Sequence, residues 1–330
     1  MGRYRTQARR HVGLTGNGQV MEDIEASNAI QHVYDFARLD RAPKGPTSLK
    51  VTPRRLLSGA TLESGKSSTV GAVLTGEHII CTLGRQARGT GAKAHTHPNE
   101  QFNYILQGVM MSDVEGDRVF AKRGTILHTP GGVVHTGLAC PDEDLVFLAI
   151  KDTRSGIIGP PVDGKYDGPN CFAGFGSRTE ERRASTAGAM AEAKQLPPGP
   201  GKRYVYEMLG DTDAWRGPAS AHVTPDADLR LPPGIRGKLL SGERLHVAAL
   251  RFDPGTTLNN YRRDNEQLVF VAEGELDCEL EDEHIIVHER CILHVPAGAR
   301  HQLSAPHGAT VVIAQDKRSD DAALSDNARA

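Results

Sequence analysis

Two histidines, His95 and His97, stand one residue apart in a segment whose residue types favour a β-strand. Side chains at positions i and i+2 of a strand point to the same face, so both imidazoles are expected on one side of a sheet. Gln101 follows four residues after His97, and a later segment rich in glycine and proline ends at His135. Three neutral imidazoles and one amide oxygen suit a borderline divalent metal ion. The residues therefore indicate a candidate metal site.

The chain contains an internal repeat that includes this segment. HTHPNEQFNYILQG, which begins at His95, aligns with YRRDNEQLVFVAEG, which begins at Tyr261, 166 residues later. Further upstream, GPTSLKVTP aligns with GPASAHVTP at a distance of 172 residues. Self-similarity over such a length indicates one domain that has been duplicated, and we place the two copies at 30–153 and 203–319.

Each copy consists of short segments that are rich in β-branched and aromatic residues and are separated by glycine, proline or aspartate. Such segments predict strands, and many short strands at regular spacing predict an all-β sandwich or barrel in each copy. Outside the copies we expect an N-terminal tail at 1–29, a connecting segment at 154–202 and a C-terminal tail at 320–330. Within the connecting segment, a stretch without proline from Arg178 to Gln195 could form a helix.

The histidine segments resemble the two sequence motifs of the cupin superfamily. The first motif, G-x5-H-x-H-x3-(E/Q)-x6-G, matches from Gly89 to Gly108, and the second, G-x5-P-x-G-x2-H, matches from Gly124 to His135. Because the domain is duplicated, the chain resembles a bicupin. The resemblance implies a double-stranded β-helix (jelly-roll) barrel in each copy. It also implies one divalent metal ion per chain, held in the first barrel by His95, His97, Gln101 and His135.

Asn103 and His128 are the candidate catalytic residues beside these ligands. Asn103 and Ile105 share a strand face with Gln101 and are expected to line the pocket. Asn103 has no equivalent in the second copy, where Val269 stands in its place, and this difference favours a role with substrate. His128 is repeated in the second copy, which favours a structural role over a catalytic one.

The second copy departs from the metal motif. Its residues at the ligand positions are Tyr261, Arg263, Gln267 and His301. Arg263 is permanently cationic and repels a divalent ion, so we expect no metal in the second barrel and a hydrogen-bonded plug in its place. Glu100 is retained there as Glu266, and we therefore expect Glu100 to maintain the fold.

A neutral ligand set permits three functions. The favoured one is a non-heme dioxygenase that cleaves an aromatic or dicarbonyl-type compound with Fe(II), because open positions around neutral ligands suit such chemistry. The layout is similar to that of ring-cleaving bicupin dioxygenases of the gentisate family. The alternative is a Lewis-acid enzyme, an isomerase, cyclase, lyase or decarboxylase, with Zn or a similar ion. For the site as a whole Fe(II) is the favoured ion, and Zn, Mn and Ni are the other candidates. The third is a cupin that only binds a small molecule.

Composition excludes other functions. The 330 residues include 39 basic and 41 acidic ones, and the net charge of −2 offers no basic field for nucleic acid and little attraction to a membrane. No segment is long and apolar enough to span a bilayer. The five cysteines are an odd number without a CxxC pair, so we expect thiols and a cytoplasmic protein. Exposed strand edges favour a homodimer, and the expected partner is a small-molecule substrate.

Overall fold

A computed structural model describes most of both copies. It covers residues 31–39, 49–52, 67–156, 158–166, 168–172, 174–175, 204–209, 223–225 and 231–317. These residues form strands and contain no α-helix, which confirms the predicted all-β class, and no helix among them is long and apolar enough to cross a membrane. The helix predicted between Arg178 and Gln195 and the two tails lie outside these ranges. All five cysteines are free thiols, and only Cys171 is more than slightly exposed.

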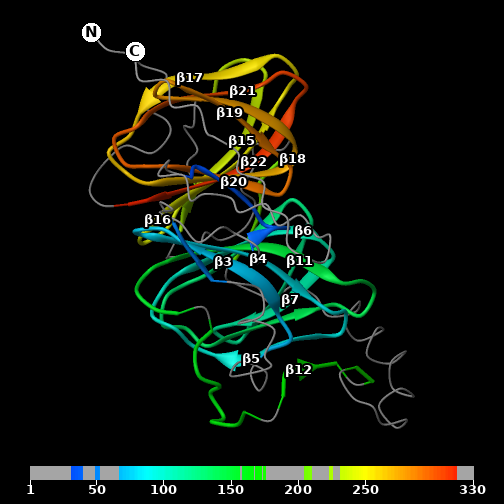
Figure 1. Ribbon diagram of the computed structural model, residues 1–330. Coiled ribbons are helices and arrows are strands. Elements are labelled where there is room, and N and C mark those ends of the chain that lie inside the picture. The colour runs from blue at the N-terminus through cyan, green and yellow to red at the C-terminus, as the bar shows by residue number, and fades with distance from the viewer. Residues whose placement is uncertain are drawn as a thin grey trace, which may run out of the picture.

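Barrel 1 consists of two antiparallel sheets and forms the cyan and green half of Figure 1. Its strands are β2 (Lys50–Thr52), β3 (Val70–Thr75), β4 (Ile79–Gln86), β5 (Thr90–His95), β6 (Gln101–Gln107), β7 (Val109–Val114), β8 (Asp117–Lys122), β9 (Thr125–Thr129), β10 (His135–Ala139), β11 (Leu145–Asp152), β12 (Asn170–Cys171) and β13 (Val205–Glu207). The larger sheet has the order β13-β9-β6-β11-β4-β3-β2, and the smaller has the order β12-β5-β10-β7-β8.

Barrel 2 forms the yellow and red half of Figure 1 and is one ten-stranded sheet. Its strands are β1 (Val33–Asp35), β14 (Thr224–Pro225), β15 (Ile235–Ser241), β16 (Leu245–Phe252), β17 (Thr256–Arg262), β18 (Gln267–Leu280), β19 (Glu283–His288), β20 (Cys291–Val295), β21 (Arg300–Ala305) and β22 (Ala309–Asp316). The long β18 pairs with β20 and β22 in its first half and with β19 and β21 in its second, and so joins two faces that are separate sheets in barrel 1.

The two barrels exchange their first strands. β1 pairs with β20 of barrel 2, and β13 pairs with β9 of barrel 1. Both strands carry Val-Tyr followed by an acidic residue, and Tyr34 and Tyr206 are completely buried. The predicted ranges 30–153 and 203–319 assign β1 to the first barrel and β13 to the second, whereas the structure pairs each with the other barrel.

A shared apolar core lies between the barrels, where the larger sheet of barrel 1 packs against β16, β18 and β22 of barrel 2. On β6, Phe102 and Tyr104 belong to this shared core, together with Leu268 and Phe270 of barrel 2. Ile105 alternates with them and packs in the separate core inside barrel 1. The alternation predicted for this strand is therefore confirmed, and it fixes which side chains of β6 can face the pocket.

Glu100 connects the barrels through a buried carboxylate. Its oxygens accept hydrogen bonds from the backbone N–H groups of Glu243 (2.9 Å), Arg244 (2.6 Å) and Leu245 (2.7 Å) at the start of β16. The side chain is 1% exposed. A Cβ atom on Gly242 would lie 2.3 Å from the Glu100 Oε2 atom, so the close approach requires glycine there.

Glu266 makes the corresponding contact in the opposite direction. It accepts hydrogen bonds from the backbone N–H groups of Glu77 (3.0 Å) and His78 (2.9 Å) of barrel 1. Charge-assisted hydrogen bonds of this kind are stronger than neutral ones, and buried N–H groups without an acceptor are costly. The repeat of Glu100 as Glu266 thus reflects a reciprocal inter-barrel contact, the structural role predicted for Glu100. We call these two residues the carboxylate clasp.

Candidate metal centre

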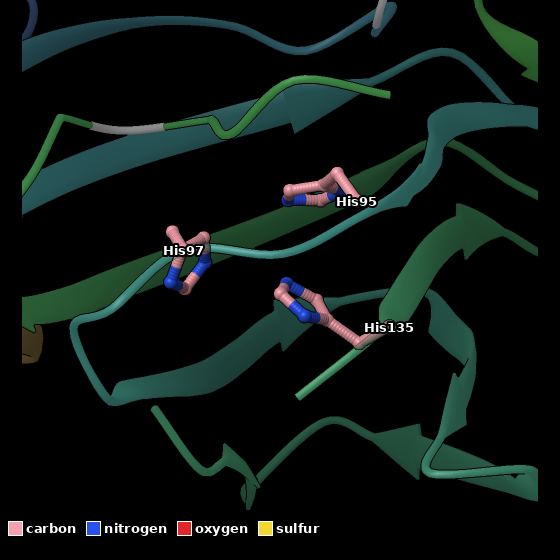
Figure 2. Close-up of side chains that lie close together, drawn as sticks. All are labelled: His95, His97 and His135. Carbon is pink, nitrogen blue, oxygen red and sulfur yellow. The ribbon is translucent and has the colours of Figure 1, made fainter. Parts of the chain in front are cut away.

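Three histidines from two adjacent strands meet inside barrel 1. His95 ends β5, His135 begins β10, and the two residues lie opposite each other in the antiparallel pairing of these strands. His97 lies just beyond β5, so the strand alternation assumed from the sequence accounts for His95 but not for His97. Nevertheless the three rings surround one space (Figure 2), and their centroids lie 4.3 to 5.6 Å apart. The potential ligand atoms of the three residues all lie within 4.8 Å of one another.

The backbone fixes the tautomer of each ring. The Nδ1–H group of His95 donates to the carbonyl of Lys93 (2.7 Å), that of His97 to Asn99 (2.8 Å), and that of His135 to Val133 (3.0 Å). Because a carbonyl only accepts, Nδ1 must carry the proton and Nε2 the lone pair. Such outer hydrogen bonds orient histidine ligands in metal sites.

Burial favours the neutral form of His97 and His135. It lowers the pKa of His97 to about 4, with further contributions from the neighbouring Lys151 and His95. It also holds the pKa of His135 well below its usual value, again assisted by the other two histidines. Neutral imidazoles bind a metal ion at pH 7 without first losing a proton. Among the described residues, the buried Nε2 atom of His135 has no hydrogen-bond partner, which fits a position for a metal ligand.

Gln101 and Asn103 complete the arrangement from β6. The Gln101 Nε2 group donates to the Asn103 Oδ1 atom at 2.7 Å, which leaves the Gln101 amide oxygen as the candidate ligand atom. Gln101 and Asn103 line the same pocket as His95 and His135. The structure therefore brings the four predicted ligands and Asn103 together, and it gives Asn103 a definite contact that positions Gln101.

Two regions of the sequence match the family model of the cupin domain, residues 82–151 and 249–314. The first region lies within barrel 1 and the second within barrel 2. The chain is a bicupin. No curated protein sequence matches it significantly.

Solved structures share the bicupin fold at low sequence identity. Salicylate 1,2-dioxygenase from Pseudaminobacter salicylatoxidans is similar over 92% of this chain and 88% of its own, with 16% identity and a TM-score of 0.54. A mutant of oxalate decarboxylase OxdC from Bacillus subtilis is similar over 88% and 78%, with 12% identity and a TM-score of 0.51. A putative glyoxylate induced protein from Pseudomonas aeruginosa is similar over 84% and 92%, with 14% identity and a TM-score of 0.53.

The structure separates His128, a predicted catalytic residue, from the pocket. His128 is completely buried on β9, where its ring lies 4.6 Å from that of Phe102 and its Nε2 atom 3.4 Å from Glu100 Oε2. His294 contacts Glu266 in the same way, at 3.1 Å. His128 thus belongs to the inter-barrel contact of the bicupin, because β9 turns this side chain away from the barrel interior. Its position lends no support to a catalytic role.

Lys151 is a pocket residue that the sequence analysis missed. It lies on β11 opposite Gln101, is 2% exposed, and places its Nζ atom 2.9 Å from the His97 Nε2 atom. Burial lowers its pKa to about 7, although the neighbouring Asp152 acts in the opposite direction. A lysine within the apolar run LVFLAIKD was a signal, but the pairing of β11 with β6 is not visible in the sequence.

The pocket is small and mostly uncharged. Its volume is about 60 Å³. Besides His95, Gln101, His135 and Asn103, it is lined by Thr69, Thr82, Gln86, Ala92, Met110, Thr136, Gly137, Phe147, Ala149, Lys151 and Ile158. Among these described residues, Lys151 carries the sole charged side chain. Apolar walls around a few polar groups are typical of small-molecule sites.

A strap formed by residues 158–166 covers one side of the pocket. Ile158 lines the pocket, Pro161 forms a β-bridge with His95, and the Val162 N–H donates to the carbonyl of Ala94 at 2.9 Å. The Lys93 Nζ atom forms an ion pair with Asp163 at 2.9 Å. The strap therefore packs directly against the strand that carries the first metal ligand.

Gly159→Ala should displace the strap. A Cβ atom at this position would lie 1.7 Å from the carbonyl oxygen of Thr96, the residue between His95 and His97 in the sequence. This is a contact with backbone, so a change of side-chain rotamer cannot relieve it. We expect a loss of about 1–3 kcal/mol in the free energy of unfolding, the usual cost of overpacking, measured by urea titration. The matched control is Gly156→Ala, whose Cβ meets nothing within 4 Å and should change stability by less than about 0.5 kcal/mol. Equal stability of the two variants would contradict the role of the strap.

Proposed function

We propose that this bicupin is a metal-dependent enzyme that binds one divalent ion in barrel 1 and acts as a non-heme dioxygenase on a small organic substrate. The observation that carries the proposal is the set of three imidazoles that surround one space and whose protonated Nδ1 atoms are held by backbone carbonyls, so that Nε2 is the ligand atom of each ring. A bound Fe(II) ion would supply open coordination positions for the substrate and dioxygen.

The chain's own residues prepare the site for this chemistry. Asn103 fixes the Gln101 amide, and the backbone carbonyls fix the orientation of the three rings. Met110, Phe147 and Ile158 form apolar walls that limit the access of water. The shared fold of salicylate 1,2-dioxygenase, a dioxygenase by name, supports the proposal.

A second candidate function is a Lewis-acid reaction, such as isomerisation, lyase chemistry or decarboxylation. This class needs a side chain that gives or takes a proton beside the metal ion. Lys151 meets the geometric requirement, since its amine lines the pocket at the ligand atom of His97. The similarity to oxalate decarboxylase shows that the same fold occurs in a decarboxylase.

Metal analysis and oxygen uptake distinguish the two functions. Protein purified with and without air should contain one equivalent of a divalent ion per chain, measured by inductively coupled plasma mass spectrometry. Iron together with oxygen consumption on addition of at least one small organic substrate, from a panel of a β-diketone, short-chain acids, salicylate and gentisate, is expected for the dioxygenase. Zinc with turnover that does not depend on oxygen would select the Lewis-acid enzyme. Protein that binds no divalent ion under either condition, or two equivalents, would contradict the proposed single site.

A further inference from the structure

We propose that Lys151 is the specificity-determining residue of barrel 1 and that it selects a small carboxylate, whose oxygen accepts a hydrogen bond from Nζ beside the metal ion. The proposal rests on the proposed function, since it assigns the substrate class of that same metal site. It applies equally to the dioxygenase and to the Lewis-acid enzyme.

The position of Lys151 is the first argument. Its Nζ atom lies 2.9 Å from the His97 Nε2 atom. A metal ion at that Nε2 atom would replace this contact and leave the Nζ donors next to the ion, within reach of a substrate group bound there. An ammonium has three N–H donors and can therefore serve a substrate oxygen in addition to other contacts. The side chain is held on β11, which pairs on both sides with β4 and β6, so the donor is placed by a rigid element.

The balance of charge is the second argument. Three neutral imidazoles and one neutral amide leave the charge of a divalent ion uncompensated, and the described residues that line the pocket include no carboxylate. Asp152 follows Lys151, but its oxygens accept hydrogen bonds from the Glu100 N–H at 3.0 Å and from Arg154 at 2.9 Å. Because charge in a buried site is costly without a counter-charge, an anionic substrate is favoured over a neutral one.

Barrel 2 provides an internal comparison. Gln101 is paired with Lys151, and the corresponding Gln267 is paired with Gln315. The Gln267 Nε2 group donates to the Gln315 Oε1 atom at 3.0 Å, so a neutral amide pair occupies this place in the barrel that lacks the histidine set. The cation at this position thus occurs only in the barrel with the candidate metal site. The comparison also shows that the fold accommodates glutamine there.

The size of the pocket restricts the acid. A volume of about 60 Å³ corresponds to roughly four to six water molecules, at about 10–15 Å³ of such volume for each. A short-chain acid fits this space better than a ring compound. We therefore expect a short α-keto or α-hydroxy acid to be preferred over an aromatic acid.

Binding to the metal-loaded full chain tests the proposal without reference to turnover. Calorimetric titrations compare pyruvate with the neutral pyruvamide, and salicylate with salicylamide, on protein whose metal content has been measured beforehand. Pyruvate should bind more tightly than pyruvamide and more tightly than salicylate. Lys151→Gln should weaken pyruvate binding by roughly 10- to 100-fold, the usual effect of one charged hydrogen bond, and leave pyruvamide binding unchanged. Lys122→Gln, at a lysine whose side chain is 70% exposed, is the matched control and should bind pyruvate as the wild type does.

The outcomes separate the two levels of the proposal. Protein without bound metal contradicts the proposed function itself. Metal-loaded protein that binds carboxylates and their amides equally, or a folded Lys151→Gln variant with unchanged pyruvate affinity, overturns the assignment of Lys151 and leaves the metal site standing. Tighter binding of salicylate than of pyruvate would overturn the inferred preference for a short-chain acid. The comparison of acid with amide uses the wild type and stays decisive even where the variant folds poorly.

Discussion

His135→Ala should reduce the bound metal from one equivalent per chain to none after dialysis. The substitution removes the Nε2 ligand atom of a buried, neutral ring that lies next to the other two rings. Substitutions that merely disturb the partners of a metal ligand cost about 10- to 100-fold in affinity, so loss of a ligand should cost at least about 100-fold. The measurement is metal content by mass spectrometry, together with competition against a chelator of known affinity.

The matched control is His301→Ala, at the corresponding position of barrel 2. His301 is also completely buried, and burial together with Arg263 lowers its pKa to about 4. We expect this variant to keep one equivalent of metal. Added metal should raise the melting temperature of the wild type and of His301→Ala but not of His135→Ala, because only a ligand that binds the folded state stabilises it. If His301→Ala lost its metal and His135→Ala kept it, the metal site would lie in barrel 2 and the assignment to barrel 1 would be wrong.

Most of the candidate metal site could be predicted from the sequence because three of its four residues lie close together along the chain. His95, His97 and Gln101 lie within seven residues of one another, and His135 lies on the strand paired with β5. The spacing of the first three residues predicts that they lie close together, and the resemblance to the second cupin motif adds His135. Lys151 is 50 residues away from Gln101, and the register of β11 on β6 brings the two together. Long-range register of this kind has no signature in the sequence of either strand.

The internal repeat predicted two barrels, but it could not show which strand joins which barrel. β1 and β13 have the same residue pattern, and exchanging them leaves every local signal unchanged. The repeated Asn-Glu-Gln block illustrates a second limit. Asn99 donates to the carbonyl of Asp152, and Asn265 donates to that of Asp316, so the first residue of the block ties down the end of a strand. Repetition of Asn99 and Glu100 therefore reflects structural roles, and among the four candidate ligands only His95 and His97 differ between the copies.

Glu100→Gln should lower the free energy of unfolding by about 3 kcal/mol, and Glu266→Gln by about 2 kcal/mol. Glu100 accepts three backbone N–H groups from barrel 2, whereas Glu266 accepts two from barrel 1, so removing the charge at Glu100 affects more hydrogen bonds. The NH2 group of the glutamine amide would face backbone N–H groups, and a donor cannot accept their hydrogen bonds. Urea unfolding of the full chain measures the difference.

The control for the carboxylate clasp is an exposed ion pair that also joins the barrels, Arg123 with Glu273, whose side chains are 70% and 50% exposed. Glu273→Gln should cost at most about 1 kcal/mol, because solvent screens such pairs. A Glu100→Gln variant that is no less stable than this control would contradict the clasp.

The pH dependence of stability gives the clasp a second test. Burial raises the pKa of Glu266, but hydrogen bonds from His294 and from the backbone of His78 and Glu77 outweigh it and hold that pKa below its ordinary value of 4.5. A carboxyl whose pKa is lower in the folded state contributes stability above its ordinary pKa and loses it as the pH falls through the folded value. The stability difference between wild type and Glu266→Gln should therefore be constant near neutral pH and shrink below about pH 4.5. A difference that stays constant down to pH 3 would show that the carboxylate charge contributes nothing, and that shape alone holds the barrels together.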